Sequence, residues 1–300
     1  MYNTTYSLIP FKSHLREFIR EKLPVSEVKP LPLNTFGKTY LTIALKRSGQ
    51  HAIINWLCHH LKSAIHMNDC TFIHKDGKMM IVPSSGRFVY YYNQNKIDSG
   101  GMVEVESEKP FKAFFEKLKK IEKFDNIIYS FEETSLKSIY LKKFIKHYNP
   151  IVLLILRDPY NCLASSFQHH NGQNTLAEMK EKKQKLISYL KQALGIENYL
   201  NYPIFTIDYG KWVQHDYYIN SLLHKLNIPF YQQAENSVTQ IQSFGGGSSF
   251  DGTETDYTSL QKQVFERWKI YQNNSDYLDL LNDELLSELA LDFFEITKPF

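Results

Sequence analysis

Apolar and polar positions along this chain predict strands that are each followed by a helix. Residues 40–45 form an apolar run, and within residues 53–61 the apolar side chains recur at helical spacing. Later segments repeat this order, with strands expected at 126–131, 151–156 and 203–207 and helices near 110–121, 135–147, 159–170, 175–194 and 214–226. Such alternation favours a mostly parallel sheet with helices on both faces.

Residues 70–95 depart from that pattern. Asp76-Gly77 separates the apolar runs 71–73 and 79–82, which predicts a hairpin, and Phe88–Tyr92 could add a strand. We interpret residues from about 66 to 110 as an insertion that contributes to an acceptor-binding surface.

The two ends of the chain predict smaller additions. Residues 11–22 predict a short helix and the prolines after it a linker, so that residues 1–38 precede a single domain over 39–300. A Gly/Ser-rich loop at 243–249 is followed by helices expected near 258–272 and 276–290. These last helices predict a helical C-terminal cap.

Composition narrows the class of protein. Hydrophobic residues make up 43% of the 300, enough for a substantial core, and a net charge of +3 argues against a dedicated nucleic-acid binder. The three cysteines form no CxxC pair, so neither a disulfide framework nor a zinc site is expected. The chain has no apolar run of transmembrane length and no signal-like start, which predicts a cytoplasmic protein without a transmembrane segment.

The first candidate for chemistry follows the strand at 40–45. It reads Lys46-Arg47-Ser48-Gly49-Gln50-His51-Ala52 and opens a helix, so its backbone N–H groups can surround an anion. A Walker A sequence is absent. Phosphoryl transfer usually enlists Mg²⁺, whereas a singly charged sulfuryl group needs only one cation and a set of amides. An ordinary strand-to-helix turn with a surface arginine is the alternative.

The second candidate follows the strand at 151–156. Arg157 ends that strand, Asp158 can cap the next helix with Pro159 at its first position, and Ser165 lies on the helix. A guanidinium and a hydroxyl so placed can converge on one phosphate. A capped strand–helix junction alone would also explain the pattern. Two anion sites at one sheet edge suit a doubly phosphorylated nucleotide.

At these residues the chain resembles the sulfotransferase superfamily, whose donor is 3′-phosphoadenosine 5′-phosphosulfate (PAPS). Residues 47–51 resemble its 5′-phosphosulfate loop, and residues 157–165 its 3′-phosphate motif. Residues 203–209 are similar to its strand ending near Tyr-Glu-Asp, and Gly245-Gly246-Gly247-Ser248 ahead of Arg267-Trp268 resembles its late nucleotide loop. The predicted fold is therefore α/β, a P-loop-like three-layer α/β/α arrangement with a central parallel sheet, an inserted hairpin region and a helical C-terminal cap.

The resemblance implies roles for individual residues. It assigns the 5′ end of the donor to the backbone of residues 48–52, the departing charge to Arg47, and the 3′-phosphate to Arg157 and Ser165. It brings Tyr209 near the adenine and closes the loop of Gly246, Gly247 and Ser248 over the nucleotide. Two departures stand out: Gln50-His51 replaces the usual threonine pair, and Ala52 stands where some members have an adenine-stacking aromatic residue. Histidine ordinarily titrates near neutral pH, so His51 predicts pH-sensitive donor binding.

Transfer to a hydroxyl also needs a group that accepts its proton. Glu132 and Glu133 follow the strand at 126–131 and should emerge at the same edge as the donor motifs. We favour Glu132 slightly, although either residue could simply cap the next helix. His74, His169 and His170 are the alternatives.

The predicted function is sulfuryl transfer from PAPS to a hydroxyl or amine, without a metal, leaving adenosine 3′,5′-bisphosphate. The aromatic run Phe88–Tyr92 and the lysine-rich helices favour a carbohydrate over other small-molecule acceptors. Two alternatives stay open: an atypical P-loop kinase, which would need ATP and a divalent metal, and a non-catalytic glycan- or nucleotide-binding module of the same fold. The PAPS assignment depends on Arg47 and Arg157 facing one another closely enough to hold opposite ends of one nucleotide.

Overall fold

The structure is a computed structural model, and it describes residues 37–61, 63–75, 78–83, 88–92, 95–99, 125–169, 175–231 and 264–299. The predicted helices at 11–22 and near 110–121, the turn Asp76-Gly77, His170 and the loop of Gly246, Gly247 and Ser248 lie outside these residues.

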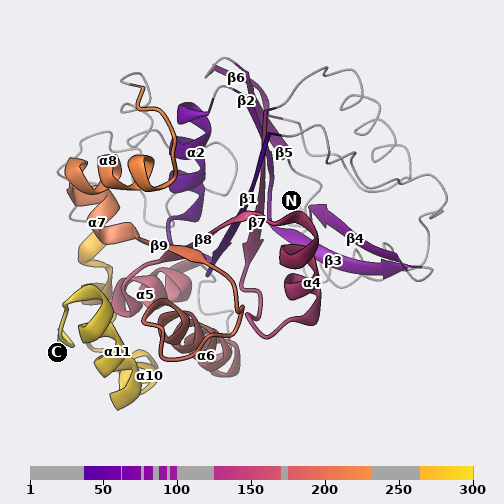
Figure 1. The fold of residues 1–300 in the computed structure, drawn as a ribbon. Coiled ribbons are helices and arrows are strands. Elements are labelled where there is room, and N and C mark those ends of the chain that lie inside the picture. Colours follow the sequence, from indigo (N-terminus) through magenta and orange to yellow (C-terminus); the bar gives the residue numbers. More distant parts are fainter. Residues whose placement is uncertain are drawn as a thin grey trace, which may run out of the picture.

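A seven-stranded sheet forms the centre of the molecule, in the order β6-β5-β2-β7-β1-β8-β9 (Figure 1). Its strands are β1 (Lys38–Ala44), β2 (Ser63–Met67), β5 (Phe88–Tyr92), β6 (Asn95–Ser99), β7 (Asn126–Glu132), β8 (Ile151–Leu156) and β9 (Ile204–Asp208). The run β2-β7-β1-β8-β9 is parallel throughout, and β5 and β6 extend it antiparallel on the β2 side. The carboxyl ends of five strands therefore meet at one edge.

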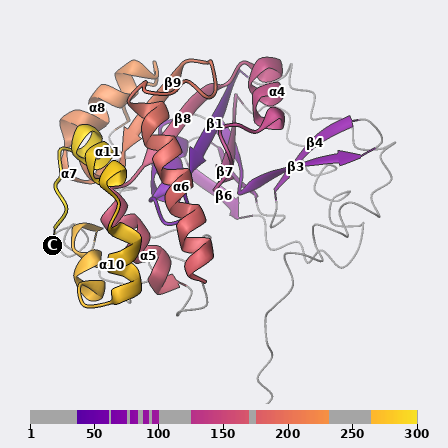
Figure 2. The same cartoon turned by 90° about the horizontal axis from the view of Figure 1, so that it is seen from below.

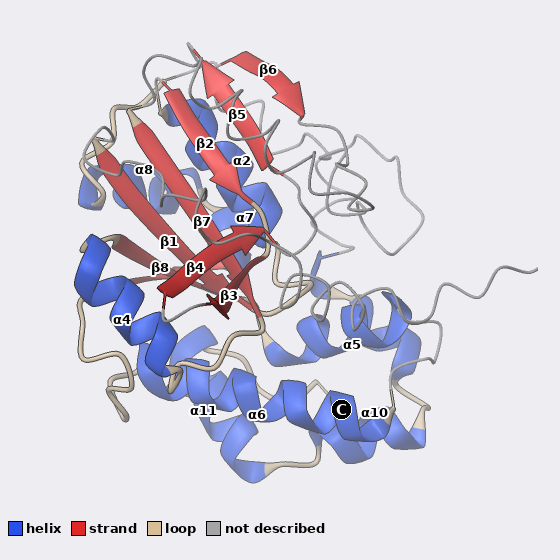
Figure 3. Cartoon of the chain, turned by 90° about the vertical axis from the view of Figure 1, so that its right-hand side faces the viewer, coloured by secondary structure: helices blue, strands red, loops and turns tan. Residues whose placement is uncertain are grey.

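Helices cover both faces of this sheet. The described helices are α2 (Gln50–His60), α4 (Ile139–Tyr148), α5 (Pro159–His169), α6 (Leu176–Ala193), α7 (Tyr209–Gln214), α8 (Asp216–Lys225), α10 (Ser275–Leu281), α11 (Glu284–Phe294) and the 3₁₀ helix η3 (Arg267–Tyr271). One core joins the sheet to α2, α7 and α8, and the other joins it to α4, α5, α6, α10 and α11. Figures 2 and 3 show these groups on opposite sides of the strands.

Side-chain alternation along the strands builds the two cores. In β1, Tyr40 and Ala44 point into one core while Leu41 and Ile43 point into the other. All six residues of β8 are apolar, as expected for a parallel strand that is covered on both faces. The predicted three-layer α/β/α class with a central parallel sheet is confirmed.

Local signals placed most elements correctly. The strand predicted at 151–156 coincides with β8, and those at 126–131 and 203–207 match β7 and β9 within a residue. The helix expected near 214–226 matches α8, and the short helix α7 that precedes it was not predicted. The helix expected at 276–290 is instead two helices, because Asp283 accepts a hydrogen bond from Leu286 N and starts α11. Of the helix expected at 258–272, residues 267–271 form η3.

The predicted hairpin is present as β3 (Cys70–Lys75) and β4 (Lys78–Pro83), paired antiparallel in a separate two-stranded sheet. β5 does not join this hairpin; it pairs with β2 in the central sheet. β2 itself was not predicted, and it occupies residues where the insertion was expected to begin. Figure 3 shows the hairpin crossing in front of the central strands.

Helices of the described segments are all too short or too polar to cross a membrane.

Candidate functional site

The first motif forms a tight loop at the carboxyl edge of β1. Ala44 is in register with Glu132 of β7 on one side and Ile155 of β8 on the other, so the loop lies between the ends of both strands. Arg47 and Gly49 adopt left-handed conformations, with φ of 72° and 85°, before α2 begins at Gln50. Such a path turns successive backbone N–H groups inward and suits an anion.

Gly49 also has a steric reason to be glycine. A Cβ atom there would lie 2.2 Å from Cε2 of Tyr209, whose ring covers the loop. Gly195 has a similar φ of 72°, but a Cβ there would meet nothing within 4 Å. A comparison of substitutions at the two glycines therefore distinguishes the cost of a left-handed backbone from the cost of a steric clash.

We expect Gly49→Ala to destabilise the protein much more than Gly195→Ala. Both substitutions carry the left-handed penalty of about 1–2 kcal/mol, and only the first forces Tyr209 aside, which adds roughly 1–3 kcal/mol of overpacking. Urea unfolding of the two variants measures the difference. Equal losses would show that Tyr209 moves away without cost.

Arg157 connects the two motifs across 110 residues of sequence. Its Nη1 donates to the backbone oxygen of Arg47 at 3.2 Å, and its Nη2 donates to that of Val264. The guanidinium carbon lies 5.6 Å from the centre of the Tyr209 ring. The Nε atom is buried and has no hydrogen-bond partner within the described part of the chain. The loops carrying Arg47 and Arg157 thus lie at the same edge of the sheet.

Ser165 contacts Arg267, a residue to which the sequence assigned no role in the site. Its hydroxyl is buried and accepts a hydrogen bond of 2.7 Å from Nη1 of Arg267. Asn161, on the same helix, holds the Arg267 segment by donating to the backbone oxygen of Phe265 at 3.0 Å. The signal in the sequence that pointed to Arg267 is its position after the glycine-rich loop.

Three arginines therefore lie close to one another: Arg47, Arg157 and Arg267. Burial lowers the pKa of Arg267, and the charges of Arg157 and then Arg47 lower it further. Burial also lowers the pKa of Arg47, although Glu132 opposes this. Because arginine stays charged in proteins, these shifts mean a free-energy cost that a bound anion would relieve.

Two further side chains at the loop carry buried polar atoms without a partner among the described residues. They are the hydroxyl of Ser48 and the side-chain amide of Gln50. Asp158 is satisfied, since its Oδ1 accepts from Asn161 N at 2.9 Å and caps α5 as predicted. Unsatisfied buried donors beside a cationic cluster fit an anionic ligand.

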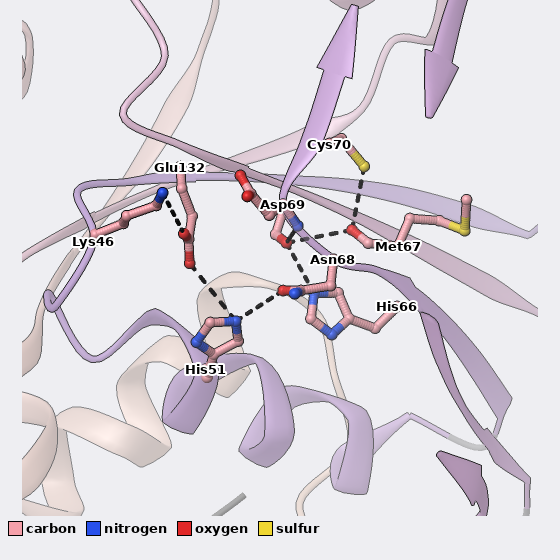
Figure 4. A network of polar contacts seen from close by, with 9 residues as sticks. Lys46, His51, His66, Met67, Asn68, Asp69, Cys70 and Glu132 are labelled. Atoms are coloured by element: carbon pink, nitrogen blue, oxygen red, sulfur yellow. Dashed lines mark hydrogen bonds and ion pairs between the residues drawn. The ribbon is translucent and has the colours of Figure 1, made fainter. Parts of the chain in front are cut away.

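Glu132 lies on the other side of the loop, at the end of β7 (Figure 4). Its Oε1 is 3.7 Å from Nε2 of His51, and its Oε2 is 4.0 Å from Nζ of Lys46. The same Nε2 lies 2.8 Å from Oδ1 of Asn68, which follows β2. Burial raises the pKa of Glu132, and the charges of His51 and Lys46 partly offset this.

Glu133 points elsewhere. Its Oε1 lies 2.7 Å from Nζ of Lys182, which also donates to Ser166 Oγ at 2.9 Å. Burial by itself would raise the pKa of Glu133, but the charge and hydrogen bond of Lys182 outweigh it and lower the pKa. The two neighbouring carboxylates therefore enter different networks.

The remaining predicted residues lie as follows. Ala52 is in the first turn of α2, and Trp56, on the same helix, is buried in the core. Tyr209 begins α7 and stacks on Trp212 at 5.9 Å between ring centroids. His74 is in β3 and His169 ends α5. Among the described residues, no three His, Cys, Asp or Glu side chains gather as a metal site would need.

No protein-family model and no curated protein matches the sequence. Solved structures of similar fold include the following two. Mouse sulfotransferase SULT7A1 complexed with PAP is 12% identical with a TM-score of 0.46, covering 85% of this chain and 86% of its own. The sulfotransferase domain of the Synechococcus PCC 7002 olefin synthase is 10% identical with a TM-score of 0.49, covering 88% and 97%. Both are sulfotransferases.

Proposed function

We propose that this protein transfers a sulfuryl group from PAPS to a hydroxyl or amine acceptor, most suitably on a carbohydrate. One observation carries the proposal: Arg157 bonds to the backbone of the loop that holds Arg47. The two anion-binding motifs are therefore joined at one sheet edge, as a nucleotide with phosphates at both ends requires. Three neighbouring cations, of which Arg157 is buried and Arg47 and Arg267 are half-buried, support the same conclusion, because they are unfavourable together until an anion arrives.

Each motif then has a distinct task. Arg157, Ser165 and Arg267 would hold the 3′-phosphate, with Arg267 already bonded to the serine hydroxyl. The backbone of residues 48–52 and the side chains of Ser48 and Gln50 would hold the 5′ end. Tyr209 would approach the adenine, and Gly246, Gly247 and Ser248 would close over the nucleotide.

The donor supplies the sulfuryl group and the bisphosphate leaving group. Arg47 would stabilise the negative charge that develops on the departing oxygen, as a preorganised cation. The proton of the acceptor would pass to the pair formed by Glu132 and His51, at the neighbouring strand end.

We expect Arg157→Ala to weaken binding of adenosine 3′,5′-bisphosphate by about 30-fold or more, since losing one partner of a buried charged contact costs at least ~2 kcal/mol. The same change also removes the bonds to Arg47 O and Val264 O. Titration calorimetry measures the affinity, with Arg157→Lys as the matched variant that keeps the charge and loses the two-pronged donor. Unchanged affinity in Arg157→Ala would remove this residue from the donor site.

The function is tested by thermal shift and then by transfer. Adenosine 3′,5′-bisphosphate without metal should raise the melting temperature, whereas ATP with Mg²⁺ should not. Stabilisation by ATP and Mg²⁺ alone would favour a kinase. No change in melting temperature with either ligand would favour a non-catalytic module.

Labelled PAPS is then offered to mono- and polysaccharides, amino sugars, simple alcohols and phenols. Label on carbohydrate supports the proposed acceptor, and label on phenols alone overturns it. Binding of the bisphosphate without transfer to any acceptor would contradict the enzyme activity.

A further inference from the structure

His51 and Glu132 form a pair at the carboxyl edge of the sheet, beside the loop of residues 45–49. The histidine side chain is 24% exposed and the glutamate 11%, so the imidazole is the more accessible member of the pair. Both carboxylate oxygens have a cationic or histidine neighbour, Oε1 facing His51 and Oε2 facing Lys46. Glu132 is thus the less exposed member of the pair and contacts the imidazole through Oε1.

The contacts of His51 determine which of its nitrogens holds a proton. Nε2 lies 2.8 Å from the side-chain oxygen of Asn68, which can only accept, and on the same side it approaches Glu132. Nε2 is therefore the donor nitrogen of the neutral ring. Its other nitrogen, Nδ1, then carries the lone pair, and Figure 4 shows it on the opposite side of the ring.

The turn that holds Asn68 is anchored to β7. The hydroxyl of Ser130 accepts from Asp69 N at 3.0 Å and donates to Met67 O at 3.3 Å, and His66 Nε2 lies 2.9 Å from it. A side chain oriented by such a network is preorganised for one task.

We propose that His51 is the catalytic base of the reaction, taking the proton of the acceptor on Nδ1, and that Glu132 and Asn68 are positioning residues that orient it through Nε2. This inference rests on the proposed function. It revises the sequence-based preference for Glu132 as the base.

The step balances as follows. The acceptor oxygen or nitrogen forms a bond to sulfur with its own electron pair while its proton moves to Nδ1 of His51. The bond between sulfur and the bridging oxygen breaks, and the electron pair leaves with adenosine 3′,5′-bisphosphate. The imidazolium that results is stabilised by the carboxylate of Glu132, which keeps its charge throughout.

Charged groups around the pair come from three elements. Lys46 and Arg47 belong to the loop after β1, Asp69 to the turn after β2, and Glu133 follows Glu132 at the end of β7. Burial lowers the pKa of His66, and the charge of His51 lowers it further, so His66 stays neutral next to the pair. All of these charged groups influence the pH dependence of turnover. The test therefore uses the protonation state of each His51 nitrogen, kcat, bisphosphate affinity and rescue by imidazole.

The first experiment needs no acceptor. Nitrogen-15 NMR of labelled histidine, assigned with His51→Gln, should show a protonated Nε2 and an unprotonated Nδ1 for neutral His51. Glu132→Gln and Asn68→Ala should reduce this preference. An Nδ1-protonated ring in the unchanged protein overturns the proposal.

The second experiment measures transfer to the best acceptor of the panel. His51→Ala should lower kcat by about 100- to 10,000-fold, the range of a general base, and should keep its affinity for adenosine 3′,5′-bisphosphate within about threefold. Added imidazole should restore part of the activity of His51→Ala and none of that of Glu132→Gln. His59→Gln, at the other end of α2, is the matched control and should keep full turnover.

The outcomes separate the two proposals. If the unchanged protein neither binds the bisphosphate nor transfers sulfate, the proposed function fails and this inference with it. If it transfers sulfate but His51→Ala keeps its kcat, only the base assignment fails. No response of His51→Ala to imidazole also overturns the base assignment. A loss of bisphosphate affinity in His51→Ala overturns it too and makes His51 a donor-binding residue.

Discussion

Arg47→Ala is expected to lower turnover by about 100- to 1,000-fold while leaving bisphosphate affinity nearly unchanged, as for the loss of one preorganised group that stabilises transition-state charge. The reason lies in which part of the residue each task uses. The backbone oxygen of Arg47 accepts from Arg157 and survives the substitution, so the two motifs stay joined. Only the guanidinium is lost, and it matters most when charge appears on the leaving oxygen.

The measurement compares kcat with the dissociation constant of adenosine 3′,5′-bisphosphate. Arg47→Lys should recover part of the turnover, because the charge returns without the planar donor. Lys46→Ala is the control for nearby charge, since Lys46 faces Glu132 at 4.0 Å. Turnover that falls only in proportion to affinity would show that Arg47 binds the donor without favouring the transition state.

Arg267→Ala should weaken bisphosphate binding by about 30-fold or more, from the ~2 kcal/mol or more that a buried charged contact contributes. It should do so without lowering the stability of the ligand-free protein. The arginine donates to Ser165 but also lies near two like charges, which burial makes more costly. Removing Arg267 relieves that repulsion. If Arg267 serves ligand binding, the melting temperature of the ligand-free variant should stay the same or rise; if it serves stability, the melting temperature should fall.

Lys269→Ala provides the matched control for Arg267→Ala. Lys269 lies two residues further along η3, is exposed, and pairs with Glu266 at 2.8 Å. Its loss should change neither binding nor stability appreciably, as for an exposed ion pair. Equal losses of affinity in both variants would mean that general positive charge attracts the nucleotide. A lower melting temperature in Arg267→Ala alone would make that residue structural.

Local patterns along the chain predicted most of the fold because they depend on near neighbours. The apolar run of β8, the cap from Asp158 and the glycine of the first loop each act within a few residues. The short helix α7 was missed: it begins directly after β9, where Asp208 caps it by accepting from Gly210 N and Lys211 N, ahead of the predicted helix that matches α8. β2 was missed as well, because Ser63 and His66 interrupt its apolar pattern. Both residues are buried: Ser63 donates to Asp125, directly before β7, and His66 contacts Ser130 within β7.

For the candidate site, the sequence supplied the motifs and the tertiary structure supplied their relations. Glu132 and Glu133 are neighbours of the same type, and only packing separates them, one toward His51 and the other toward Lys182. Arg267 reaches Ser165 from 102 residues away, a contact that no local pattern encodes.

The sequence by itself determined the α/β class and the two strand–loop–helix motifs, since hydrophobic periodicity, caps and turn residues act over short range. The tertiary structure alone decided which side chains from those motifs meet. It brought Arg157 to the Arg47 loop, added Arg267, and set His51 in front of Glu132. These contacts depend on the order of parallel strands in the sheet, and that order follows from burying two apolar faces at once.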